Sequence, residues 1–252
     1  MHQNNVVFIK VHKCSSTSVR KIIEHYSIHK SLNLLDRWSG IPHHKRKSSP
    51  NNIHWIRDND WSTPAQQKYN ISTRHKSYEE RFFNKYIEDP KYVSFVRHPL
   101  VRALSTFHST DTPPHKKAKG VNVSFESWWY SHRQGLKQPL CLETKTKYAC
   151  TTDNHMSYML GYDSMEDINY RSLNERYEYI GLTEQFDKSI DEMWKSLGWE
   201  KIWKTNYPVI RNNGSGLNRL TGCSKTFIKD FEEANQLDYK LYNLVLSGIF
   251  EI

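Results

Sequence analysis

Two polar segments of the sequence carry residue types that bind phosphate-like anions. The first is KVHKCSSTS (10–18), which combines Lys13 with four hydroxyl side chains. It begins within the last two residues of a β-branched run, VVFIKV (6–11). A loop between a strand and a helix start also offers backbone N–H groups, so we expect it to bind an anion. The second is RHPLVRALS (97–105), whose guanidinium and hydroxyl groups can hold a phosphate by charge-assisted hydrogen bonds. Two separate anion sites indicate a ligand that carries two phosphate groups.

The first segment is not a Walker A loop. That motif reads G-x-x-x-x-G-K-[ST], whereas here the glycines are absent and Lys13 precedes a cluster of Ser and Thr residues. A kinase that binds ATP with magnesium is therefore disfavoured. Taken alone, a lysine beside Ser and Thr is also typical of a solvated loop, so the prediction depends on the second segment.

Three strand–loop–helix units can position these segments. They combine strands over 6–11, 92–97 and 179–182 with helices that begin near Thr17, Pro99 and Phe186. In the first unit, Ser16 or Thr17 is available as the N-cap of a helix that we expect to end near Ser27. Alternating strands and helices predict an α/β fold, a doubly wound parallel sheet flanked by helices. Such sheets bind ligands beyond the carboxyl ends of their strands, where both polar segments would lie.

The length of 252 residues favours one domain over the whole chain, 1–252. Two basic segments rich in Pro, Ser and Lys, at 39–52 and 109–121, predict loop insertions near 39–68 and 109–121 that flank a substrate cleft. Apolar residues at helical spacing from Phe227 to Val245 predict a helical C-terminus packed on the core.

The charge balance favours an anionic partner. Lysine and arginine number 36 against 27 acidic residues, a formal net charge of +9. No apolar run is long enough for a membrane helix, and the start of the sequence lacks a signal peptide. The four cysteines form no CxxC pair of the kind found in structural zinc sites, although a bridge between Cys141 and Cys150 stays open.

The pair KVHKCSST and RHPLVRALS resembles the paired signatures of sulfotransferases that use 3′-phosphoadenosine 5′-phosphosulfate (PAPS). Within these enzymes the sequence is most similar to the galactose-3-O-sulfotransferase (galactosylceramide sulfotransferase) group, whose loop reads K-T-H-K-T-x-S-S-T. Val11 and Cys14 replace two of its threonines. Further similarity covers NISTRH (70–75), NHMSYMLGYD (154–163) and YIGLTEQFDKSIDEM (179–193), but residues 30–68 match nothing in the group.

The resemblance implies a P-loop-like sulfotransferase fold and an enzyme that moves a sulfuryl group from PAPS to a carbohydrate hydroxyl by in-line displacement, without a metal. The acceptor would be a galactose-type glycan or glycolipid. The 5′-phosphosulfate would lie on the first segment, the 3′-phosphate on Arg97 and Ser105, and Arg211 near the adenine or 3′ end. Lys13 would stabilise the charge on the departing phosphate. The donor-binding residues implied are Lys13, Cys14, Ser15, Ser16, Thr17, Ser18, Arg97, Ser105 and Arg211.

The acceptor hydroxyl must lose a proton, and a histidine is suited to accept it. We favour His75, because NIST is expected to form a short strand whose carboxyl end brings His75 to the same edge as Lys13, and because related enzymes have a histidine there. His12 is the competing candidate, and Glu79 or Glu80 stays open.

The acceptor could stack on flat aromatic faces, for which Trp55, Trp61, Trp128 and Trp129 are candidates, although tryptophans more often pack in the core. We expect a carbohydrate or small hydroxyl acceptor as partner, no nucleic acid and no membrane contact from the sequence itself; the oligomeric state stays open. The alternatives are a sulfotransferase for small-molecule alcohols and a non-catalytic protein that binds anionic glycans. Because the related enzymes are Golgi type II membrane proteins, the resemblance implies the Golgi lumen if an anchor has been trimmed away, and otherwise the cytoplasm.

Overall fold

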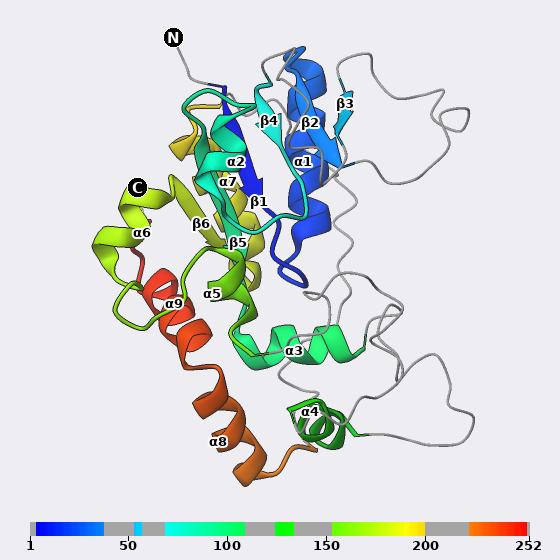
Figure 1. Cartoon of the computed structure of the whole chain (residues 1–252), viewed down its shortest axis with the longest axis vertical. Coiled ribbons are helices and arrows are strands. Elements are labelled where there is room, and N and C mark those ends of the chain that lie inside the picture. Colours follow the sequence, from blue (N-terminus) through cyan, green and yellow to red (C-terminus); the bar gives the residue numbers. More distant parts are fainter. Residues whose placement is uncertain are drawn as a thin grey trace, which may run out of the picture.

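The computed structural model describes residues 4–37, 53–56, 69–108, 124–133, 153–199 and 222–250. In these ranges the centre of the molecule is a six-stranded sheet of order β3-β2-β4-β1-β5-β6 (Figure 1). Each neighbouring pair is parallel. The strands are β1 (Val6–Ile9), β2 (Leu34–Arg37), β3 (Ile53–Ile56), β4 (Ile71–Ser72), β5 (Lys91–Val96) and β6 (Tyr179–Leu182).

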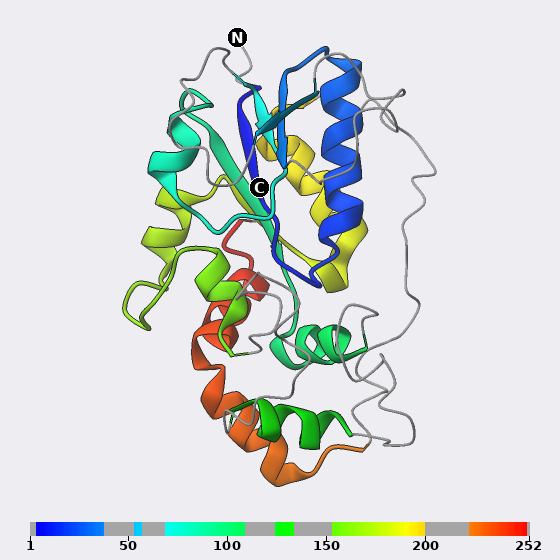
Figure 2. The same ribbon diagram turned by 45° about the vertical axis from the view of Figure 1, so that its right-hand side comes forward.

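Helices cover both faces of the sheet, as the alternation of elements predicts (Figure 2). The helices α1 (Ser16–His29) and α7 (Phe186–Ser196) lie on one face. They are side by side, since Tyr26 of α1 packs edge-on to Trp194 of α7 with ring centroids 5.3 Å apart. The helices α2 (Glu80–Asn84) and α6 (Tyr170–Arg176) lie on the other face. The prediction of a doubly wound parallel α/β sheet is therefore confirmed.

A second group of helices lies beyond the carboxyl edge of the sheet. Figure 1 shows α3 (Pro99–Phe107) next to that edge, with α4 (Phe125–Arg133) and α8 (Lys225–Ala234) further away. Their aromatic side chains form a core of their own, in which Trp128 is 6% exposed and Trp129 fully buried. The suggestion that these two tryptophans offer faces to a sugar is wrong, because the packing of α3, α4 and α8 covers their rings.

The remaining described helices connect the two groups. They are α5 (His155–Met159) and α9 (Gln236–Leu246), and α9 contacts α5, α3, α8 and β6. The predicted helical C-terminus is confirmed by α8 and α9. No helix within the described ranges is long and apolar enough to cross a membrane.

The three predicted strand–loop–helix units are present, but β1 ends at Ile9, two residues before the predicted end at Val11, and α1 starts differently. The strands 92–97 and 179–182 match β5 and β6 to within one residue, and α1 extends two residues beyond Ser27. The N-cap is Ser15, not Ser16 or Thr17. Those two residues already have helical backbone, because Ser15 turns the chain into the helix with a left-handed conformation (φ 53°).

The sequence did not predict β2, β3, α2, α4, α5 or α6. The four-residue strand β3 falls within the expected loop insertion at 39–68, so part of that segment belongs to the sheet. An apolar run of three or four residues is too short to distinguish from a loop by its periodicity. The basic segments 39–52 and 109–121 themselves lie outside the described residues.

Candidate active site

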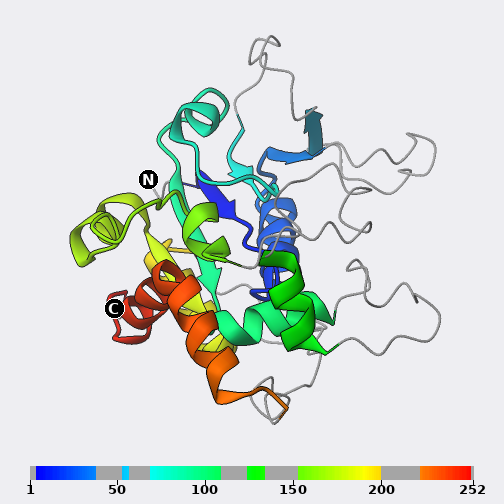
Figure 3. The same ribbon diagram turned by 60° about the horizontal axis from the view of Figure 1, so that its bottom comes forward.

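The order of the strands brings three loops that carry predicted site residues to one edge of the sheet. β1 lies between β4 and β5, with Val7 beside Ser72 and Ile9 beside Ser94. Because the strands are parallel, the segments that follow them, 10–15, 73–79 and 97–98, open at the same edge. Figure 3 shows the molecule with this end turned forward. The edge is where doubly wound sheets bind their ligands.

The loop 10–15 leaves backbone amides available at the start of α1. Lys13 and Ser15 both have left-handed backbone, with φ of 66° and 53°, and the Ser15 side chain makes no capping hydrogen bond. The amides of Ser18 and Val19 both donate to the Ser15 carbonyl, at 2.9 and 3.2 Å. The amides of Ser16 and Thr17 precede them, at the positive end of the helix dipole. This geometry suits an anion.

The side chains of this loop and of the first turn of α1 differ in how far they are exposed to a ligand. Cys14 is fully buried and its thiol lies 3.7 Å from the His12 carbonyl oxygen; burial raises the pKa of the thiol far above its ordinary value. A Cys14 contact to the donor would therefore come from its backbone. Ser16 and Ser18 are 7% and 8% exposed, whereas Thr17 is exposed.

Arg97 joins the second anion segment to the first. Its Nη1 donates a hydrogen bond to the Lys13 carbonyl oxygen at 3.3 Å. Its Nε is buried and has no hydrogen-bond partner among the residues described. A buried guanidinium N–H without an acceptor is costly, and an anion at this position would supply one. The two segments that were predicted separately are thus in direct contact.

Two further residues of the predicted donor site are less closely tied to this loop. Ser105 is partly buried on α3 and lies six residues after Pro99, about 9 Å further along the helix axis. Arg211 lies outside the described part of the chain. The cysteines 141 and 150 lie outside it as well.

Two histidines from loops and one from the start of a helix meet beside the anion segments. The rings of His12 and His75 stack with centroids 4.5 Å apart and an interplanar angle of 18°. The short strand expected at NIST is present as β4, and it brings His75 to the same edge as Lys13, as predicted. His12 Nδ1 also lies 3.3 Å from Nε2 of His155, the first residue of α5. His155 was missed, although it belongs to the segment NHMSYMLGYD that resembles the related enzymes.

The electrostatics of the cluster keep His12 neutral. Burial, followed by the charges of Lys10, Arg102 and Lys13, lowers the pKa of His12 to about 4. Arg102 on α3 is 1% exposed, and its burial lowers the pKa of its guanidinium, an effect that nearby Asp238 opposes. The positive charges of this region favour an anionic ligand.

Of the two candidate glutamates, Glu80 is poorly placed for chemistry at this edge. Glu80 lines a polar hollow of about 440 Å³ together with Lys91 and Glu178, at the amino ends of β5 and β6. That is the edge opposite to the histidines, so Glu80 is removed from the candidates for the base. Glu79 pairs with Lys76 at 2.5 Å.

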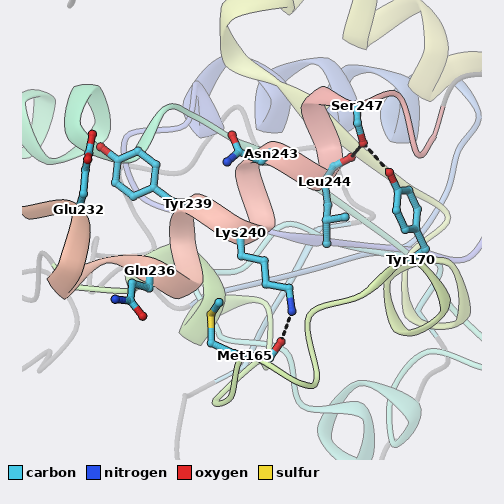
Figure 4. A pocket seen from close by; sticks show the side chains of 9 residues that line it. All are labelled: Met165, Tyr170, Glu232, Gln236, Tyr239, Lys240, Asn243, Leu244 and Ser247. Atoms are coloured by element: carbon cyan, nitrogen blue, oxygen red, sulfur yellow. Dashed lines mark hydrogen bonds between the residues drawn. The ribbon is translucent and has the colours of Figure 1, made fainter.

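A larger hollow, of about 730 Å³, lies along α9 and is shown in Figure 4. Tyr170 Oη and Ser247 Oγ share a hydrogen bond of 2.8 Å at one end of it, and Lys240 donates to the Met165 carbonyl. None of the predicted donor-binding residues lines this hollow. Among the described residues, no cluster of His, Cys, Asp or Glu has the geometry of a metal site.

Comparison with known proteins assigns the chain to a family. The sequence model of the sulfotransferase family matches residues 1–244, which include both anion segments and all three histidines. A search of curated proteins found no match to the chain. The match covers nearly the whole sequence and agrees with the parallel α/β sheet: the chain belongs to the sulfotransferase family.

Proposed function

We propose that the protein transfers a sulfuryl group from PAPS to a hydroxyl group of a carbohydrate, in particular a galactose-type glycan or glycolipid. The observation that carries this proposal is the direct contact between Arg97 and the loop at the start of α1. One ligand with phosphates at both ends of a nucleoside would engage both segments at once. A single-phosphate ligand would leave one of them without its acceptor.

The residues present fit this donor. The amides of Ser16 and Thr17 and the ammonium group of Lys13 would hold the 5′-phosphosulfate, and Arg97 with Ser105 would hold the 3′-phosphate. The bound donor supplies the sulfuryl group and a phosphate leaving group. Lys13 would stabilise the negative charge that grows on the leaving oxygen, more in the transition state than in the ground state.

His75 is the proposed base for the acceptor hydroxyl. It stacks on His12 at the same edge as the donor loop, where a hydroxyl in line with the sulfur would lie. General base catalysis of this kind contributes roughly 10²- to 10⁴-fold to the rate.

The carbohydrate acceptor rests on the resemblance to galactose-3-O-sulfotransferases and on the net charge of +9, which would attract an acidic glycan. A small-molecule alcohol is the second candidate acceptor. A galactose-type acceptor would place the enzyme in the Golgi lumen, and a small alcohol is compatible with the cytoplasm.

Thermal-shift titration tests the donor site. At a hundred times its dissociation constant, adenosine 3′,5′-bisphosphate should stabilise the protein by about 2.7 kcal/mol, a shift of roughly 5–10 °C. ATP and inorganic phosphate should stabilise it far less. The variants Lys13→Ala and Arg97→Ala should lose most of the shift, whereas Lys229→Ala, at an exposed position of α8, should keep it. Equal shifts with ATP and the bisphosphate would contradict the proposal.

A transfer assay with labelled donor tests the acceptor. Galactose-terminated glycans and glycolipids should accept label, and Lys13→Ala should lower the turnover number by about 10²- to 10³-fold. Label transferred only to small alcohols would identify a small-molecule alcohol as the acceptor. Binding of the donor without transfer of label to any hydroxyl would indicate a binding protein.

A further inference from the structure

His155 is a buried side chain that touches the candidate site and has no role in the reaction proposed so far. It is 1% exposed, and its ring lies 5.3 Å from the His12 ring, tilted by 57°. Its Nε2 is 3.3 Å from His12 Nδ1, within hydrogen-bond reach. Since neither histidine carries a charge, one nitrogen of this pair must donate a proton and the other accept it.

Reciprocal caps between α5 and α9 fix the position of His155. The carboxylate of Asp238 on α9 accepts hydrogen bonds from the amides of Met156 and Ser157, at 3.1 and 2.8 Å. In return, the side-chain oxygen of Asn154 accepts from the amides of Leu237 and Asp238, at 3.1 and 3.3 Å. Asp238 is fully buried. The helix start that carries His155 is therefore held by buried, charge-assisted hydrogen bonds.

The second nitrogen of His155 decides the direction of the hydrogen bond. Nδ1 is buried and has no hydrogen-bond partner in the part of the chain that the structure describes. If His12 donated, His155 would carry its proton on Nδ1, as a buried N–H without an acceptor. If His155 donates from Nε2, then Nδ1 is an unprotonated lone pair. An unpaired buried N–H is rarer in proteins than an under-satisfied acceptor, so the second arrangement is favoured.

The surrounding charges support the neutral form of both rings. Lys10, Lys13 and Arg102 act on His12, and Arg102, His12 and His75 act on His155. Together with burial, which is the largest cause, they lower the pKa of His155 well below its ordinary value. Asp238 is an acidic group close to this cluster; it accepts from the amides at the start of α5 and lies near the charge of Arg102. A lone pair on His155 Nδ1 is also better matched to the positive charge of Arg102 than an N–H would be.

We infer that His155 is a positioning residue, which donates from Nε2 to His12 Nδ1 and so holds His12 in the form protonated on Nε2. In that form His12 is a neutral hydrogen-bond donor with no lone pair left to accept a proton. His75, whose ring stacks on that of His12, is left as the base. The assignment of His75 rests on the proposed function, whereas the protonated nitrogen of His12 does not.

Nitrogen-15 NMR of histidine side chains in the full-length protein tests the inference without any assay of transfer. The wild type should show His12 protonated on Nε2 and unprotonated on Nδ1 from pH 7 down to about pH 5, with the signals assigned by their absence in His12→Asn. The signal of His12 protonated on Nδ1 would overturn the inference. So would titration of His12 near the ordinary histidine pKa of about 6.5.

Two variants of His155 add a kinetic test. His155→Leu removes the donor, and His155→Gln places an amide N–H near the position of Nε2. The leucine variant should lower the turnover number at least about tenfold, since a wrong tautomer can cost up to about 10⁴-fold, while its affinity for adenosine 3′,5′-bisphosphate stays unchanged. The glutamine variant should recover most of the loss. A folded leucine variant with undiminished turnover would refute the positioning role.

The outcomes separate the two proposals. If the leucine variant does not fold, the wild-type NMR signals still decide the tautomer. If the wild type transfers no sulfuryl group to any acceptor, the proposed function fails, and the NMR signals again decide the tautomer on their own.

Discussion

Removal of the His12 imidazole should flatten the dependence of folding stability on pH. In the unfolded chain a histidine titrates near pH 6.5, whereas burial and the neighbouring cations lower the pKa of His12 to about 4 in the folded protein. Between these two values the unfolded chain binds a proton that the folded protein does not. Stability is therefore complete above about pH 7 and decreases as the pH falls through this window.

The size of the effect follows from the two pKa values. Proton linkage for this single group reduces the free energy of unfolding by about 2 kcal/mol between pH 7 and pH 5, and by about 3.4 kcal/mol once the pH is below 4. The change is large against a total stability of about 5–15 kcal/mol. His155, whose pKa is lowered in the same direction, should add to the decline that the wild type shows.

Urea unfolding at pH 7, 6 and 5 measures the effect. The quantity compared is the change in the free energy of unfolding between pH 7 and pH 5. A difference in overall stability between His12→Asn and the wild type therefore does not affect the test. The variant should lose about 2 kcal/mol less than the wild type between pH 7 and 5. His25→Asn, at an exposed position of α1, is the matched control and should follow the wild type, since it leaves the His12 imidazole in place. Equal declines in His12→Asn and the wild type would refute the burial of a neutral His12.

Three other substitutions test the fold and the site. Gly181→Ala should destabilise the protein by about 1–3 kcal/mol in urea unfolding, because the added Cβ would lie 2.7 Å from the ring of Phe95. The control Gly222→Ala, with no atom within 4 Å of its Cβ, should leave the stability unchanged. Equal effects of the two substitutions would contradict this packing. Asp238→Ala should cost about 3–5 kcal/mol, because two amides of α5 lose their acceptor and the buried guanidinium of Arg102 loses a nearby negative charge, and a loss below 1 kcal/mol would refute that role. His75→Ala should lower the turnover number about 10²- to 10⁴-fold at unchanged affinity for adenosine 3′,5′-bisphosphate, and undiminished turnover would assign the base elsewhere.

Elements of the fold were predictable where a local pattern carries the information. A β-branched run followed by KVHKCSSTS specifies a strand, an anion loop and a helix within fifteen residues, and RHPLVRALS does the same with Pro99 at the helix start. The family follows from these two patterns together. The roles of Lys13, Arg97 and His75, and the single domain over 1–252, stay predictions that the proposed experiments address.

Other features needed the structure because they depend on neighbours distant in sequence. Trp128 and Trp129 are core residues only because α8, a hundred residues later, covers them. Glu80 follows β4 closely in sequence, but its helix turns back along the sheet, so that its side chain faces the opposite edge.

The sequence by itself determined the alternation of strands and helices and the chemistry of each loop, since hydrophobic periodicity and hydroxyl, lysine and arginine content are local properties. Tertiary structure decided which loops meet. His12, His75 and His155 come together because β4 and β5 flank β1 and because α9 holds the start of α5. The lateral order of parallel strands depends on how the connecting helices pack on the faces of the sheet. No short stretch of sequence determines that packing.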